Sequence, residues 1–348
     1  MYNARYWSRT NMTNTKTSSK EIKTDYTKKV TAMAVVVVLA VSIFGGNLMT
    51  LQAMADNGNT TNSNTVSPVN EKQAARQTLR QTLQQDQVTY KQATQAADLA
   101  YRQAVQTANL AHSQAVQNAN TAYDQAVKDA RTSYDNAIKG AHGSATIIGP
   151  AMATRDQAIG AAQTTKTDSI STADVARDKA IYDAWATHET TVYAALATRD
   201  GNDGTAQSTF YTAIGNSTLA TRTQTVGQAH VTEDNAILQA RQTRITAVEN
   251  AEITKDQAIG AAQTAYTNAE TNARVTLDNG YTSNGKTWNA ALQSYWNTVA
   301  PLEQTRDNTI AKVNADHESS VGSADATRDQ AIDQAHAAMY GSISAAYQ

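Results

Sequence analysis

Apolar and polar positions recur every eleven residues over most of the chain, most clearly between Tyr90 and Ser144. Each unit there has Ala at positions 4 and 8, and nearly always Val or Ile at position 5. Positions three and four residues apart lie on one face of a helix. The pattern therefore predicts long α-helices with one Ala-rich face. No segment alternates with the period of two that a half-buried strand requires.

The same frame continues from Leu79 to Met339 with few interruptions. Eleven residues in three turns make about 3.67 residues per turn, which favours a nearly straight or slightly right-handed arrangement of helices. Ala at positions 4 and 8 lets a neighbouring helix approach closely, while the branched residue at position 5 supplies bulk. We expect an all-α protein of long helices, packed as an elongated antiparallel hairpin or bundle, or as a coiled-coil rod.

Clusters of turn-forming residues interrupt the frame and predict where the helices end. We expect breaks near residues 140–150, at 200–204 (the sequence DGNDG) and at 279–286. The unit that begins at Phe210 carries one extra residue, and a seven-residue step near Pro301 predicts a stutter or a short break. Isolated Gly residues at position 6, such as Gly160, Gly227 and Gly260, indicate softness or contact points between helices.

The N-terminal residues have the character of a secretory signal. A basic stretch precedes the apolar run Val30–Gly46, and a small-residue pattern at Ala53 and Ala55 would allow cleavage before Asp56. Residues 1–55 are therefore interpreted as a signal peptide, with an uncleaved N-terminal membrane anchor as the alternative. The polar residues 56–69 are expected to form a disordered linker, and residues 70–348 form the helical repeat region.

Composition narrows the classes of function. Residues 56–348 carry 22 Lys and Arg against 29 Asp and Glu, a net formal charge of −7, which argues against nucleic-acid binding. The chain has no Cys, and its six His form no metal-binding motif. No nucleophile or phosphate-binding motif is present, and the many carboxylates are assigned to solvated faces. We expect neither a cofactor, a metal nor an enzymatic activity.

Aromatic side chains supply the candidates for recognition. One group interrupts the regular pattern and is predicted to be an interaction patch: Tyr281, Trp288, Tyr295 and Trp296. A second group occupies position 1 of successive units, where the unit between the two pairs carries His112: Tyr90, Tyr101, Tyr123 and Tyr134. This second group, the ring ladder, is expected to serve in packing, or to bind glycans or another helix.

The repeated units also carry a resemblance to known proteins. RDQAI begins at Arg155 and again at Arg328, and KDQAI begins at Lys255. Such units behind an extended signal resemble the alanine- and threonine-rich coiled-coil surface proteins of lactic-acid bacteria. The resemblance implies a secreted or cell-surface protein of a Gram-positive bacterium that acts as a spacer, an adhesin or an envelope scaffold.

The resemblance leaves the partner and the means of retention open. The implied partners are the chain itself, other helical or envelope components, and cell-wall or host glycans, with membrane contact only through residues 30–46. An accessory role in cell-wall metabolism and an uncleaved, membrane-anchored helical protein remain as alternatives. The last residues contain no LPxTG sequence, so release or non-covalent retention is expected rather than covalent attachment to the wall.

Overall fold

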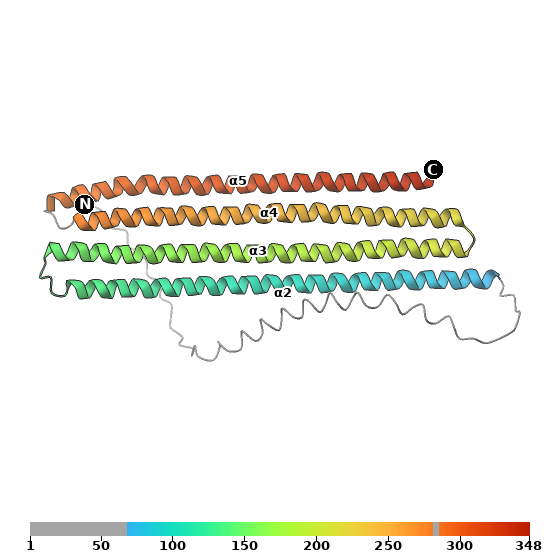
Figure 1. Cartoon of the computed structure of the whole chain (residues 1–348), viewed down its shortest axis with the longest axis horizontal. Helices are drawn as coiled ribbons and strands as arrows, with labels where there is room; N and C mark the ends of the chain where they lie inside the picture. The colour runs from blue at the N-terminus through green and yellow to red at the C-terminus, as the bar shows by residue number, and fades with distance from the viewer. Residues whose placement is uncertain (1–67, 281–284) are drawn as a thin grey trace, which may run out of the picture. The chain divides into compact units, whose positions relative to one another are not determined.

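The computed structural model describes residues 68–280 and 285–348, which together form one unit of α-helices (Figure 1). The helices are α2 (Pro68–Ile138), α3 (Ala145–Ala213), α4 (Ser217–Gly280) and α5 (Gly285–Tyr347). The described residues contain no strand. The predicted all-α fold of long helices is confirmed.

The helices lie side by side in chain order and run antiparallel (Figure 1). Helix α2 packs on α3, α3 on α4, and α4 on α5, and no other pair of described helices shares an extended interface. With 63 to 71 residues each, the helices are about 95–105 Å long. The expected antiparallel arrangement is therefore present as an open row with two free outer faces, one on α2 and one on α5.

Small residues in the repeat frame let the helices approach closely. Position 8 of α2 is buried in four successive units, each only 7% exposed: Ala97, Ala108, Ala119 and Ala130. Between α3 and α4 the backbones come nearest at Gly204 and Gly227, where a Cβ atom on either would lie 2.8 Å from the Cα atom of the other. Larger side chains fill the wider parts of this interface, above all Ile245, which is 1% exposed.

The turn between α2 and α3 occupies residues 139–144 and overlaps the start of the predicted break at 140–150. His142 and Gly143 adopt positive φ angles of 43° and 81°, which glycine tolerates without strain. The backbone N–H of Ser144 donates to the carbonyl of Ala141 at 2.7 Å and closes the turn. Helix α3 then begins at Ala145, so Pro150 lies inside its first turns instead of ending a helix.

The predicted break at 200–204 is wrong, because α3 continues through it to Ala213. The turn lies at residues 214–216, where Gly215 has a φ angle of 81° and the side chain of Asn216 accepts a hydrogen bond from the backbone N–H of Leu219 at 3.0 Å. The extra residue in the Phe210 unit marks this turn. Glycine in DGNDG serves the close contact with α4, so a cluster typical of turns is here a packing motif.

The third predicted break is confirmed, since α4 ends at Gly280 and α5 begins at Gly285. Pro301 lies within a continuous α5, so the seven-residue step produces no break. Helix α2 begins at Pro68, where a missing N–H costs nothing, so the last two residues of the predicted linker are helical. Some sequence predictions fall outside the residues that the structure describes. They are the signal peptide, its cleavage site at Ala53, Ala55 and Asp56, and the patch residue Tyr281.

None of the described helices is long and apolar enough to span a bilayer.

Candidate functional site: a polar layer across the helix row

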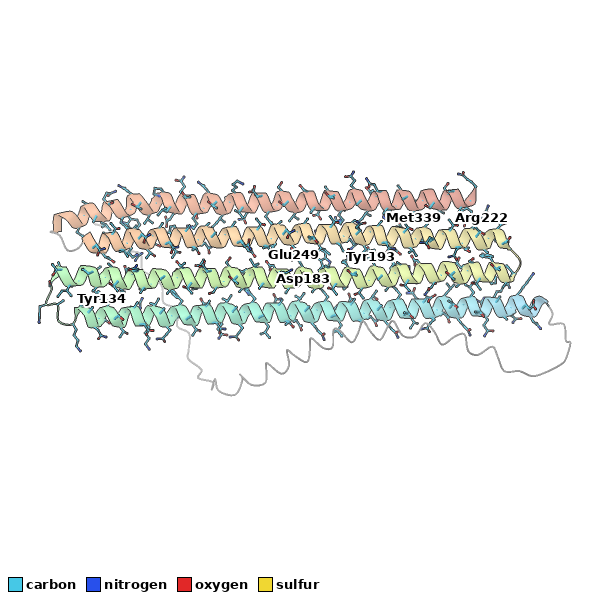
Figure 2. All side chains as sticks on the ribbon, viewed as in Figure 1. Tyr134, Asp183, Tyr193, Arg222, Glu249 and Met339 are labelled. Carbon is cyan, nitrogen blue, oxygen red and sulfur yellow. The ribbon has the colours of Figure 1, made fainter. Side chains whose placement is uncertain are left out.

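The ring ladder of α2 faces a line of cationic side chains at position 1 of α3. The Arg155 guanidinium lies 4.8 Å from the centre of the Tyr134 ring, whose place between α2 and α3 Figure 2 shows. The Lys166 ammonium lies 4.9 Å from the Tyr123 ring, and the Arg199 guanidinium 4.9 Å from the Tyr90 ring. At these three rungs position 1 of one helix thus meets position 1 of the other.

The two middle rungs complete this ladder. Tyr101 packs against His188 with ring centres 5.7 Å apart, and His112 Nε2 lies 2.7 Å from Asp174 Oδ1. All five rings of α2 are partly buried. Of the expectations for the ring ladder, the structure therefore shows packing against another helix, with the ring faces covered by α3.

A double-mutant cycle at one rung should measure this contact. Tyr123→Leu and Lys166→Met each remove one partner, and we expect a coupling free energy of about 0.5–1 kcal/mol that falls as salt is added. Urea unfolding followed by circular dichroism gives the free energies of unfolding. Lys91→Met, at an exposed position of α2, is the control and should show no coupling with Tyr123→Leu. Additive effects of the first two changes would contradict a direct cation–ring contact.

Helices α3 and α4 bring carboxyl groups together in pairs at position 2 of the repeat. Asp156 faces Asp278, and Asp178 faces Asp256, each pair linked through a hydrogen bond between carboxyl groups. Such a bond requires that one of the two groups be protonated. A third pair joins Asp200 and Asp234 through their charges. These pairs recur every 22 residues along the interface.

Burial is the main cause of the altered acidity of the α4 members. It raises the pKa of Asp278 to about 6, and the charge of Asp156 and the hydrogen bond with it add to the rise. Burial likewise raises the pKa of Asp256 to about 6, followed by the hydrogen bond with Asp178. The pKa of Asp234 is also about 6, again mainly through burial.

Each α3 member of a pair instead bonds to the arginine that precedes it. Arg155 Nε lies 2.6 Å from Asp156 Oδ1, and Arg177 Nε lies 2.6 Å from Asp178 Oδ1. The raised pKa values belong to Asp256 and Asp278, which places the shared proton on α4. The assignment of all carboxylates to solvated faces is therefore wrong for position 2 of these helices. A partial sequence signal existed, because three of these acids at position 2 are followed by glycine at position 6: Asp156 by Gly160, Asp200 by Gly204 and Asp256 by Gly260.

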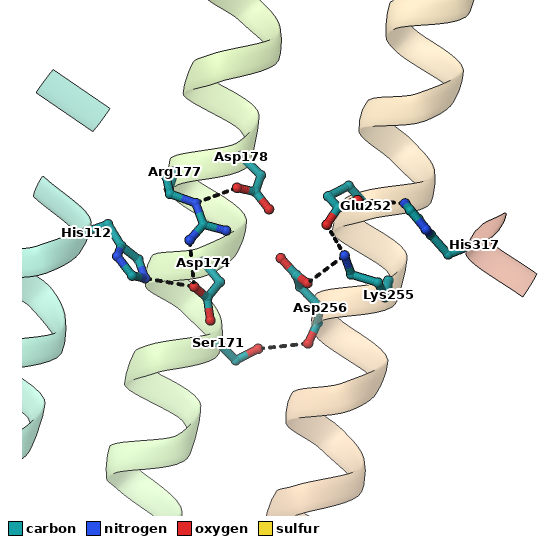
Figure 3. Close-up of polar contacts among 9 residues, drawn as sticks. All are labelled: His112, Ser171, Asp174, Arg177, Asp178, Glu252, Lys255, Asp256 and His317. Atoms are coloured by element: carbon teal, nitrogen blue, oxygen red, sulfur yellow. Dashed lines mark hydrogen bonds and ion pairs between the residues drawn. The ribbon is translucent and has the colours of Figure 1, made fainter. Parts of the chain in front are cut away.

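Two neighbouring sets of polar contacts together reach all four helices at mid-length (Figure 3). His112 of α2 contacts Asp174 of α3, which also lies 3.3 Å from Arg177 Nη1. The Ser171 hydroxyl donates to the backbone carbonyl of Asp256 in α4 at 3.2 Å.

Farther along the second set, Lys255 bonds to Glu252 within α4. His317 of α5 completes it, with Nε2 2.6 Å from Glu252 Oε2. We call these two sets together the polar layer.

The charges of the polar layer depend on protonation. It contains four carboxyl groups, two permanent cations and two histidines that are charged only when protonated. With all four carboxyl groups ionised, the formal charges balance when both histidines are protonated and sum to −2 when neither is; the proton that Asp256 takes up near pH 6 raises either sum by one. The carboxylate oxygens of Asp178, Glu252 and Asp256 lie within 4.8 Å of one another and are chemically able to hold a cation. The Lys255 ammonium already bonds to Glu252 and lies 3.8 Å from Asp256, so it supplies positive charge at this place.

The predicted aromatic patch is only partly exposed. Tyr295 is 8% exposed, and its hydroxyl donates to Glu270 at 3.2 Å. Trp288 is partly buried. Trp296 is 56% exposed and packs edge-on against Tyr295, with ring centres 5.2 Å apart. Of the patch residues that the structure describes, Trp296 is the one available to a partner.

Comparison with known proteins gave no match to a protein family, to a curated protein or to a solved structure.

Proposed function

We propose that the protein is a secreted or cell-surface scaffold of a Gram-positive bacterium, in which the helix row acts as a stiff spacer. The observation that carries this proposal is the length over which the helices pack. Four helices of about 95–105 Å share three continuous interfaces in one repeat frame. The signal-like N-terminus and the acidic charge of residues 56–348 support an extracellular location.

The topology indicates how such a spacer would be oriented. Because the row contains an even number of antiparallel helices, Pro68 and Tyr347 lie at the same end (Figure 1). The turn at residues 139–144 lies at the opposite end. A chain retained at the cell through its N-terminal side would therefore project this turn outward, together with Trp296 near the start of α5. Recognition by a partner would then take place at the far end of the row.

Cell fractionation followed by N-terminal sequencing tests the location. We expect the protein in the wall fraction or the medium, with Asp56 as its first residue. An intact N-terminus in the membrane fraction would support the membrane-anchored alternative. Recovery of the protein in the cytoplasm would overturn the proposed location.

Small-angle X-ray scattering of the exported protein tests the spacer role. A row of these helices predicts a maximum dimension of at least about 100 Å for the helical unit. A variant that lacks one eleven-residue unit at the same level in each of the four helices keeps all three registers. It should be shorter by about 16 Å with unchanged helical content. A compact particle, or a variant of unchanged length, would contradict the proposal.

A further inference from the structure

The free face of α5 carries five exposed residues at intervals of eleven: Trp296, Asp307, Glu318, Asp329 and Tyr340. The series is symmetric about Glu318, with an acid on either side and an aromatic residue beyond each acid. Trp296 is 56% exposed and Tyr340 is 67% exposed. We call this series the α5 stripe.

The frame that defines the α5 stripe holds along the helix. The contacts of α5 with α4 keep one register from Arg306, which lies over the Tyr266 ring, to Tyr347, which lies under Arg222. The residues that face α4, among them Ala324, Ala335 and Met339, recur in the same eleven-residue phase. The α5 stripe therefore keeps a constant direction beside them and remains on the outer surface.

The α5 stripe repeats the sequence pattern of the interface between α3 and α4. RDQAI occurs both at Arg155, where Asp156 is 8% exposed and faces α4, and at Arg328, where the side chain of Asp329 is 63% exposed. Arg328 Nη2 lies 2.7 Å from Asp329 Oδ1, the same neighbour contact that Arg155 makes with Asp156.

Position 6 agrees in two other units of α5, although it is Asp333 after RDQAI at Arg328 and Gly160 after RDQAI at Arg155. Position 6 is small at Ala311 and Gly322, as it is at Gly204 and Gly227 in the central interface, and a Cβ atom on Gly322 would meet nothing within 4 Å.

The free face of α2 lacks this pattern. Its position 6 carries long polar side chains, all exposed: Gln84, Gln95, Gln106, Gln117 and Lys128. Such side chains hold a neighbouring helix away and favour water. Both outer faces carry exposed acids at position 2, which on α2 are Asp124 and Asp135, so the two faces differ at position 6: α5 has small residues there at Ala311 and Gly322, and α2 has long polar side chains throughout.

We propose that the α5 stripe is the docking surface for a second copy of this chain, which packs α5 against α5 antiparallel about a twofold axis at Glu318. In a twofold interface, if one residue contacts a second residue of the other copy, the second residue of the first copy makes the same contact with the first residue of the other. A series that is symmetric about its centre satisfies this requirement. The register of the α3–α4 interface then places Asp307 opposite Asp329 of the second copy. Trp296 lies opposite Tyr340 of the second copy, and Ala311 opposite Gly322. The row becomes a layer of eight helices.

Disulfide cross-linking of the full chain tests the axis, because the sequence contains no Cys. Glu318→Cys should form a disulfide-linked dimer under mild oxidation at about pH 5, where a shared proton can relieve repulsion between the facing acids at 307 and 329. Ser113→Cys, at the exposed position 2 of α2, is the matched control and should remain largely monomeric. Equal cross-linking at both positions, or none at residue 318, would overturn the proposal.

Light scattering on the same full chain tests the contact surface. Gly322→Gln places on α5 the side chain that α2 carries at position 6. We expect it to shift the dimer–monomer equilibrium at least tenfold toward monomer, with unchanged helical content. Gln106→Arg on α2 should leave the dimer intact. A wild-type chain that stays monomeric, or a dimer–monomer equilibrium that Gly322→Gln leaves unchanged, contradicts the inference.

Discussion

Asp278→Asn is expected to stabilise the protein at neutral pH by about 1–3 kcal/mol. Asp278 is 3% exposed and faces Asp156, and its pKa of about 6 shows that ionising it within the fold is unfavourable. The amide has nearly the same shape, carries no charge and donates a hydrogen bond to the Asp156 carboxylate. Asp124→Asn, on the exposed face of α2, should change the free energy of unfolding by less than about 0.5 kcal/mol.

The same carboxyl groups set the pH dependence of the wild-type protein. Asp234, Asp256 and Asp278 have folded pKa values of about 6, above their usual value of 3.8. Between these values the folded state binds more protons than the unfolded state, so stability falls as pH rises from about 4 to about 6. The hydrogen bond with Arg244 lowers the pKa of Asp325. The stability that ionised Asp325 adds to the folded state is therefore lost only in stronger acid.

Urea unfolding of the wild-type protein and of Asp278→Asn should therefore be measured at several pH values. We expect the wild-type protein to be most stable near pH 4–5, and the variant to depend less on pH above that range. Greater wild-type stability at pH 7.5 than at pH 5, or a destabilising effect of Asp278→Asn at neutral pH, would contradict the shared-proton interpretation.

Gly227→Ala is expected to destabilise the protein by about 1–3 kcal/mol, although Ala favours a helix over Gly by about 1 kcal/mol. The new Cβ atom would lie 2.8 Å from the Cα atom of Gly204, and a backbone atom cannot rotate away as a side chain can. Helices α3 and α4 must therefore separate locally. Gly204→Ala should cost a similar amount, and the double variant less than the sum, because one separation accommodates both changes.

Gly341→Ala is the matched control for this prediction. It lies in α5, where a Cβ atom would meet nothing within 4 Å, so only the helix preference of Ala applies. We expect no change or a gain of up to about 1 kcal/mol. A neutral or stabilising effect of Gly227→Ala in thermal and urea unfolding would show that the two backbones are not in contact.

The eleven-residue frame predicted the helices, because the same positions must be small or apolar wherever one helix covers another. The short breaks favoured antiparallel neighbours, with a coiled-coil rod as the alternative. The frame could not show how many neighbours each helix has. The sequence RDQAI occurs at Arg155 in α3 and at Arg328 in α5, and its surroundings differ. Helix α3 has a neighbouring helix on both sides, whereas α5 has one on a single side. Buried carboxyl pairs such as Asp156 and Asp278 were therefore assigned to water.

Local turn chemistry was informative where glycine was needed for its φ angle and misleading where it was needed for its size. Gly143 adopts a positive φ angle in the turn after α2, as the glycine cluster there predicts. Gly204 lies in a helix, although the residues around it, DGNDG, are typical of a turn. Glycine is needed there because a Cβ atom would clash with the backbone of Gly227. The tertiary contact that decides between these roles is not visible in one segment alone.

The most direct test of the open row is the distance between its outer helices. Ser113 follows His112 and Asn314 precedes His317 by one turn, so both exposed residues lie near the two ends of the polar layer. Spin labels on Ser113→Cys and Asn314→Cys, diluted with unlabelled protein, report the distance between α2 and α5. The row predicts a backbone separation of about 25–30 Å, three helix spacings, whereas a closed bundle would bring it to about 10 Å and contradict the account.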